Sequence, residues 1–212
     1  MLKNIHGRAR KVSSMTKRVS LSGMLLRHAP LIAVEVVLLV SFVRDTSQGN
    51  PESAFMAMGL LQVSLTPLVV EAIGRVRIAL YLQLLYAVLI FTGGYMGSYL
   101  RFYDVWEPWD TIVHFYSGIM IALWADFILR AVMRKHRFEM PRWLYALIVT
   151  SFSALVAMLW EIGEFTADQM TGSRAQIDNY DTMIDMITGT LSALIVAVIL
   201  VARPRPPRSE LS

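Results

Sequence analysis

Six long apolar stretches, separated by short polar segments, constrain the fold of this chain more than any other feature. Crossing the roughly 30 Å hydrocarbon core of a bilayer takes about 20 apolar residues in a helix. Charged residues make up only 17% of the chain, against about 25% in soluble domains. The stretches cover residues 24–43, 54–70, 78–100, 110–130, 143–164 and 181–201. We therefore predict an all-α, polytopic membrane bundle with six transmembrane helices.

The bundle is expected to form a single domain over residues 24–202. A basic N-terminal segment (1–23) precedes it, and a short basic tail (203–212) follows it. Pro67 lies in the second stretch, where we expect it to kink the helix without ending it, because a neighbouring helix can satisfy the carbonyl that proline leaves free. Three pairs have the small-residue spacing that lets membrane helices approach closely: Gly93 with Gly97, Gly118 with Ala122, and Gly189 with Ala193.

The lysine and arginine residues fall on one side of this arrangement. Seventeen of the twenty lie in the N-terminal segment, the second and fourth connecting loops and the tail, and the other three are Arg44, Arg101 and Arg174. Because cytoplasmic loops collect lysine and arginine, we expect both termini in the cytoplasm and a multi-pass protein in a bacterial cytoplasmic (inner) membrane. The net charge of +4 then reflects orientation, and no nucleic-acid partner is expected.

The sequence also limits the cofactors. The chain has no cysteine, which excludes disulfides, iron–sulfur clusters and thiolate zinc sites. It has no phosphate-binding glycine-rich loop and no Ser-His-Asp pattern, which argues against a nucleotide or covalent mechanism. A haem is likewise not expected.

Acidic residues gather on the opposite, outward side. Eleven of the sixteen lie in outward loops or at the outer ends of the predicted helices, nine of them between residues 104 and 185. Charged groups at membrane depth are costly, so they usually face a protein interior or a cavity and mark a functional site. Three groups have helical spacing, which places their members on one helix face: Asp110 with His114; Glu161, Glu164 and Asp168; and Asp178, Asp181 and Asp185.

These acids predict a divalent-metal site. Carboxylates one helix turn apart repel each other, and they persist together when they share protons, pair with cations or bind a metal. Three outward arginines cannot neutralise eleven acids. Magnesium, manganese, zinc and iron are the candidate ions, since oxygen ligands suit hard cations and an imidazole shifts the preference toward manganese, iron or zinc. The candidate ligands are Asp110, His114, Glu161, Glu164, Asp181 and Asp185, with Asp168 supporting them through hydrogen bonds.

Glu161 and Glu164 are also the candidate catalytic acid and base. Structural roles remain the alternative for other acids: Asp110 and Asp181 stand where a helix N-cap is expected, and Asp178 is placed as a solvated loop acid. His114, Glu161 and Glu164 have no such structural explanation.

Two acids lie away from this group, Glu35 near the middle of the first stretch and Asp126 toward the cytoplasmic end of the fourth. They either relay protons or ions across the bundle or are neutral, hydrogen-bonded packing residues. An aromatic cluster at the outer ends of the third and fourth stretches is interpreted as an interfacial belt, with a substrate platform as the alternative: Tyr99, Phe102, Tyr103, Trp106 and Trp109.

Three motifs in order resemble the YjdF-like family of bacterial inner-membrane proteins and, more distantly, VanZ-like proteins. They are Asp110-Thr-Ile-Val-His114-Phe115 with Gly118, Trp160-Glu161-Ile-Gly-Glu164, and Asp181-Thr182-Met-Ile-Asp185-Met186 with Gly189. Phe165 departs from this pattern, in which a tryptophan follows the second glutamate. The resemblance implies a multi-span bacterial membrane protein of undefined biochemical function, and it supplies no substrate.

Three functions are compatible with the sequence. The first is an enzyme whose metal site acts on an envelope or lipid-headgroup substrate. The second is a cation- or proton-coupled transporter, with Glu35 and Asp126 continuing a path inward. The third is a non-catalytic accessory subunit whose polar cluster docks a partner. The lipid bilayer is the expected surrounding, and the oligomeric state is left open.

Overall fold

The computed structural model describes residues 21–171 and 175–203, and these residues are almost entirely helical. The predictions for the N-terminal segment and for most of the tail lie outside the described residues. The helical elements are α1 (Leu21–Gln48), α2 (Pro51–Ser64), α3 (Thr66–Gly74), α4 (Leu80–Leu89), η1 (Ile90–Tyr99), α5 (Phe102–Val105), α6 (Pro108–His136), α7 (Arg142–Thr171) and α8 (Asn179–Ala202).

Six helices are long and apolar enough to cross a membrane, which confirms the predicted fold class. Two are composite, because α2 with α3 and α4 with η1 each make one candidate span. The helices extend beyond the apolar stretches. α6 continues through a basic last turn to His136, where positive charge is favourable beside the helix C-terminus. α7 continues to Thr171, so Asp168 lies on the same helix as Glu161, as its spacing predicted.

The prediction that Pro67 leaves its helix unbroken is wrong. The helix ends at Ser64 and a new one begins at Thr66, because proline has no N–H to donate and its ring crowds the carbonyl four residues earlier, which belongs to Val63. That carbonyl accepts hydrogen bonds from the Thr66 hydroxyl (2.6 Å) and from the Tyr86 hydroxyl of α4 (2.6 Å). The expectation that a neighbouring helix satisfies the freed carbonyl is therefore confirmed.

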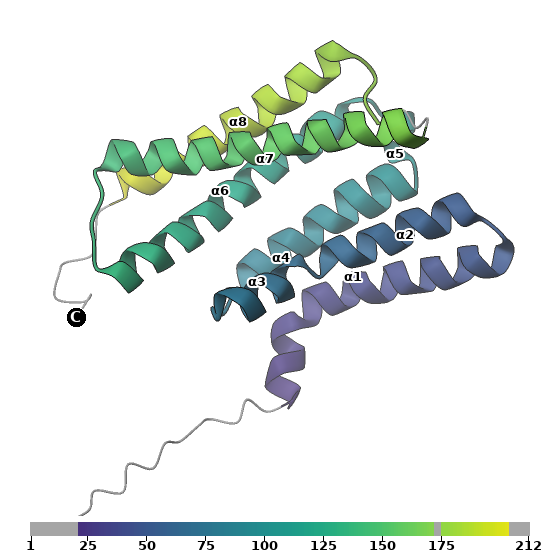
Figure 1. The fold of residues 1–212 in the computed structure, drawn as a ribbon, viewed down its shortest axis with the longest axis horizontal. Helices are drawn as coiled ribbons and strands as arrows, with labels where there is room; N and C mark the ends of the chain where they lie inside the picture. The colour runs from purple at the N-terminus through teal and green to yellow at the C-terminus, as the bar shows by residue number, and fades with distance from the viewer. Residues whose placement is uncertain (1–20, 172–174, 204–212) are drawn as a thin grey trace, which may run out of the picture.

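The helices form two groups, α1–α4 with η1 and α6–α8, which lie beside each other in Figure 1. α6 joins the groups by packing against α4 and η1. Within the second group α8 packs closely along α6, since Gly118 lies directly against the Gly189 carbonyl and the Ser192 side chain. The predicted close approach at a small-residue spacing is thus present at Gly118 and Gly189, and the structure shows that α6 and α8 are the two helices that make it.

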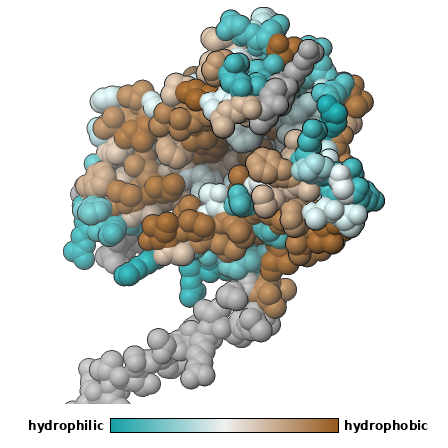
Figure 2. Space-filling model, turned by 45° about the vertical axis from the view of Figure 1, so that its right-hand side comes forward, coloured by the Kyte–Doolittle hydropathy of each residue, from teal (hydrophilic) through white to brown (hydrophobic). Residues whose placement is uncertain are grey.

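The outer surface of the bundle is apolar. Many large hydrophobic side chains are more than a third exposed, among them Val40, Phe55, Leu147 and Ile187. Figure 2 shows broad areas of hydrophobic residues on the face in view, with hydrophilic residues gathered toward its margins. A lipid bilayer is the surrounding that satisfies such a surface.

Candidate functional site

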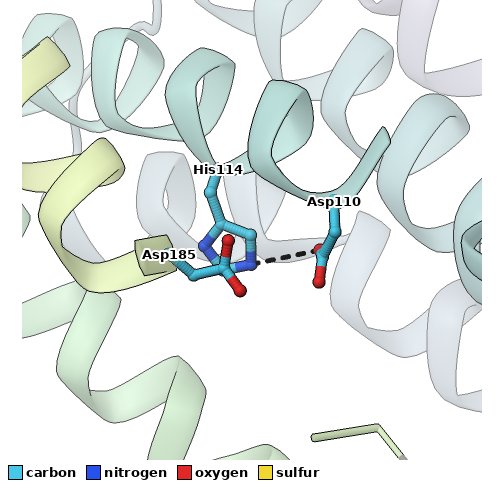
Figure 3. A group of neighbouring side chains, drawn as sticks. All are labelled: Asp110, His114 and Asp185. Carbon is cyan, nitrogen blue, oxygen red and sulfur yellow. Dashed lines mark ion pairs between the residues drawn. The ribbon is translucent and has the colours of Figure 1, made fainter. Parts of the chain in front are cut away.

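Asp110, His114 and Asp185 form a compact group near the N-terminal ends of α6 and α8, in which His114 and Asp185 are buried and Asp110 is half-buried (Figure 3). One ligand atom from each lies within 4.8 Å of the other two. His114 Nε2 is 3.4 Å from Asp110 Oδ1, and His114 and Asp185 are 7% and 2% exposed. Asp110 and His114 come from successive turns of α6, and Asp185 from the second turn of α8, as their spacing predicted.

Glu161 of α7 completes the group from a third helix. Its side chain is only 4% exposed, and its Oε1 lies 3.9 Å from His114 Nε2. Among the described residues, no hydrogen-bond donor reaches this oxygen. A buried carboxylate oxygen without a partner is costly, so its position beside the imidazole suits binding of a cation or a proton.

The segment after α7 holds Glu161 in place. Asp168 accepts hydrogen bonds from the backbone N–H groups of Ala175 (2.8 Å) and Gln176 (3.0 Å). Gln176 Nε2 in turn donates to the backbone oxygen (3.0 Å) and to Oε2 (3.3 Å) of Glu161. Asp168 therefore acts on Glu161 through Gln176, a residue that sequence reasoning missed because its contact partner is fifteen residues away.

Replacing Gln176 with alanine is expected to weaken divalent-metal binding by about tenfold, the size of effect seen when residues behind metal ligands are lost. The reason is that Glu161 loses the amide that fixes its carboxylate. Isothermal titration calorimetry of the purified protein with Mn²⁺ measures the change. The control is Gln169→Ala, which replaces another glutamine, near the end of α7. Unchanged affinity in Gln176→Ala would contradict this positioning role.

The remaining predicted ligands lie near the group but are engaged elsewhere. Glu164 Oε1 accepts a hydrogen bond from Trp160 Nε1 at 2.7 Å. Asp181 Oδ2 accepts a long one of 3.4 Å from the backbone of Ile177. The cap of α8 is Asp178, whose side chain accepts from the backbone N–H groups of Tyr180 and Asp181. The interpretation of Asp181 as this cap is therefore wrong, as is that of Asp178 as a merely solvated acid.

Tyr103 is a second residue that the sequence did not single out for this site. Its ring lies against Gly97, where a Cβ would overlap it, and its hydroxyl lies near Gly93. Burial raises the pKa of Tyr103, and the carboxylates of Asp110, Glu164 and Asp185 raise it further. The phenol thus stays protonated at neutral pH. Only the Gly93 and Gly97 pair signalled a close contact, which is made by this ring.

The other aromatic residues divide between two places. Phe102, Trp106 and Trp109 contact one another, with ring centroids 5.1 to 6.4 Å apart. Trp109 Nε1 donates to the Thr92 carbonyl at 3.2 Å. Tyr99 instead bonds to Arg44 and Asp45 at the end of α1. The predicted single cluster is therefore split, and its outer part keeps the arrangement of an interfacial belt.

The two acids proposed as a relay lie apart from the site. Glu35 accepts a hydrogen bond from the Ser64 hydroxyl between α1 and α2. Asp126, near the opposite end of α6, accepts from the Tyr145 hydroxyl and from Arg130 Nε, the latter at 2.7 Å. These are the contacts of hydrogen-bonded packing residues, and the relay stays a prediction.

The donor set of the buried group suits a divalent cation. Two carboxylates and one imidazole combine hard oxygen ligands with a nitrogen, which favours manganese, iron or zinc over calcium. Metal–ligand bonds of about 2.0–2.2 Å place neighbouring donors roughly 3–4 Å apart. The ligand atoms of Asp110, His114 and Asp185, all within 4.8 Å of one another, are thus close to the spacing that one ion would require.

The fold and the site define a class: a polytopic α-helical membrane protein with a polar cluster between three of its helices. The chain belongs to the family described as predicted membrane protein (DUF2238), which matches residues 27–205. It is also similar to an uncharacterised protein of Thermotoga maritima, with 33% identity over 139 residues that cover 64% of this chain and 69% of the relative. No solved structure matches the chain. The expected membrane family of undefined function is confirmed, while the YjdF-like and VanZ-like resemblance stays a prediction.

Proposed function

We propose that this chain is a metal-dependent hydrolase of the bacterial cytoplasmic membrane that acts on phosphoester bonds of envelope lipids. The observation that carries the proposal is the buried group of Asp110, His114 and Asp185 with the unpartnered Glu161 oxygen beside it. Acidic residues with a structural role at a helix end either lie in solvent or cap the helix. The residues of this group do neither, since their side chains converge from three helices.

The proposed roles follow from position. Asp110, His114 and Asp185 would hold a divalent ion, which would supply a bound water of lowered pKa and a Lewis acid toward a phosphoryl oxygen. Glu161 Oε1 is the base that takes the proton of the attacking water. Glu164 and Asp181 would join the coordination only if their side chains rotated away from their present hydrogen-bond partners.

Lysine and arginine distribution supports the orientation. Cytoplasmic loops collect these residues. Seventeen of the twenty lysine and arginine residues fall on the side opposite the site, which favours an outward-facing site. The substrate is then a component of the outer leaflet or of the envelope beyond it.

The test is hydrolysis by the purified protein in liposomes of bacterial phospholipids loaded with Mn²⁺ or Zn²⁺, followed as release of water-soluble phosphate esters. Wild type is expected to release them in a metal-dependent way, and His114→Ala to lose at least a hundredfold in rate, because removing a ligand empties the site. The control is His28→Ala, which replaces a histidine near the start of α1. Metal-dependent cation flux without ester release would replace this proposal by transport, and equal release by His114→Ala would refute it.

A further inference from the structure

A groove of about 600 Å³ lies between α7, α8 and residues 176–178, which precede α8. Its lining changes character with depth. Met158 of α7 and Met186 of α8 lie farthest from the outer ends of their helices, and Asp168 lies ten residues beyond Met158 along α7. At 1.5 Å per residue, the groove therefore runs about 15 Å from an apolar floor to a polar mouth.

The groove opens toward the bilayer. Ile162 and Phe165 line it and are 51% and 53% exposed, on a bundle whose surface carries many other exposed large hydrophobic side chains. In a membrane, the molecules that lie against this wall are the lipids of the surrounding leaflet. An occupant can enter sideways without leaving the bilayer, with its chain on the methionines and its headgroup at the mouth.

The charge of the mouth selects among lipids. Glu161, Asp168 and Asp178 line the groove, and its lining as described includes no lysine or arginine. Gln176 and Asn179 add amide oxygens, which accept hydrogen bonds. Two of the outward arginines are already paired, Arg44 with Asp45 and Arg101 with Asp104. An anionic headgroup is repelled here, whereas an ammonium group is attracted and can donate hydrogen bonds.

We propose that this groove binds an amine-bearing phospholipid, with its ammonium group among the carboxylates and its acyl chain along Met158 and Met186. Glu161 connects the groove to the metal group, because it lines the first and lies 3.9 Å from His114 Nε2 in the second. In a phospholipid the phosphoester is next to the headgroup amine. As an identification of the substrate the inference rests on the proposed function, and as a statement about binding it stands alone.

The experiment uses the full chain in nanodiscs doped with photoactivatable phosphatidylethanolamine or with phosphatidylglycerol of the same acyl chains. Peptide mass spectrometry locates the labelled residues. We expect phosphatidylethanolamine to label residues 158–165 and 182–186 about fivefold more than phosphatidylglycerol, the ratio that a partly solvated charge interaction supplies. Asp178→Asn keeps the oxygen that caps α8 and removes a charge, so it should lower this ratio.

Met186→Trp fills the floor of the groove and is expected to abolish the labelling. Ile187→Trp adds the same bulk one residue on, at a lipid-exposed position outside the groove, and should leave it intact. Equal labelling by both lipids, or labelling that survives Met186→Trp, would overturn the inference.

His114→Ala and chelator-treated wild type separate the two proposals. Both should keep the phosphatidylethanolamine labelling, since Asp110, His114 and Asp185 do not line the groove and Glu161 is unchanged in both. Labelling of the groove in a protein that binds no metal would uphold lipid binding and refute the proposed function. Metal-dependent ester release without preferential labelling would do the reverse.

Discussion

Replacing Gly118 with alanine is expected to force α6 and α8 apart and to lower the free energy of unfolding by about 3 kcal/mol, the upper part of the range for overpacked cores. A Cβ at this position would overlap the carbonyl of Gly189 and the Oγ of Ser192. Neither backbone nor a fully buried serine can yield cheaply. Because Asp110 and His114 lie on α6 and Asp185 on α8, the same shift separates the metal ligands.

Denaturant titration in detergent measures this loss, and metal affinity should fall in the same variant. Gly163→Ala is the matched control, since a Cβ at Gly163 of α7 meets nothing within 4 Å. That change should stabilise the protein slightly, by roughly 0.5–1 kcal/mol, because alanine is the better helix former. Equal stability of the two variants would show that α6 and α8 do not pack as described.

Glu161→Gln is expected to lower the rate of ester hydrolysis by about 10²–10⁴-fold, the usual worth of a general base. The amide has the shape of the carboxylate but cannot take a proton from water. Asp110, His114 and Asp185 remain, so the protein should keep its metal. Initial rates at saturating Mn²⁺, together with the metal content of the same sample, measure both properties.

Glu52→Gln, at the exposed start of α2, is the control for this variant and should hydrolyse like wild type. A Glu161→Gln protein that loses metal and rate together would make Glu161 a fourth ligand instead of the base. One that keeps full activity would remove it from the mechanism.

Much of the fold followed from patterns that are local in sequence. Six apolar stretches of bilayer length predict six membrane-spanning helices, because backbone groups without hydrogen bonds are too costly in lipid. The four-residue spacing of Asp110 and His114 placed both side chains on one face of α6 before any packing was known. Helical periodicity alone carries that information.

What the sequence could not supply was which helices meet and at what height. The joining of Glu161 to His114 depends on how α7 packs against α6, and the role of Gln176 on how the following segment folds back. From the sequence, Tyr103 was predicted to be one of the interfacial aromatic residues, whereas in the structure its ring packs against Gly97. Pro67 was read as a kink, but whether proline bends or ends a helix depends on the partners that its freed carbonyl finds, here Thr66 and Tyr86.

The metal content of the purified wild-type protein tests the central claim most directly. The full chain is loaded with Mn²⁺ or Zn²⁺, freed of unbound ion by gel filtration and measured by elemental analysis beside Asp185→Asn. Asp104→Asn serves as the control, because Asp104 is exposed and pairs with Arg101 away from the group. We predict one tightly held ion per chain in wild type and the control, and none in Asp185→Asn. A wild-type protein that holds no ion after loading, or an Asp185→Asn variant that holds as much as wild type, would contradict the metal site.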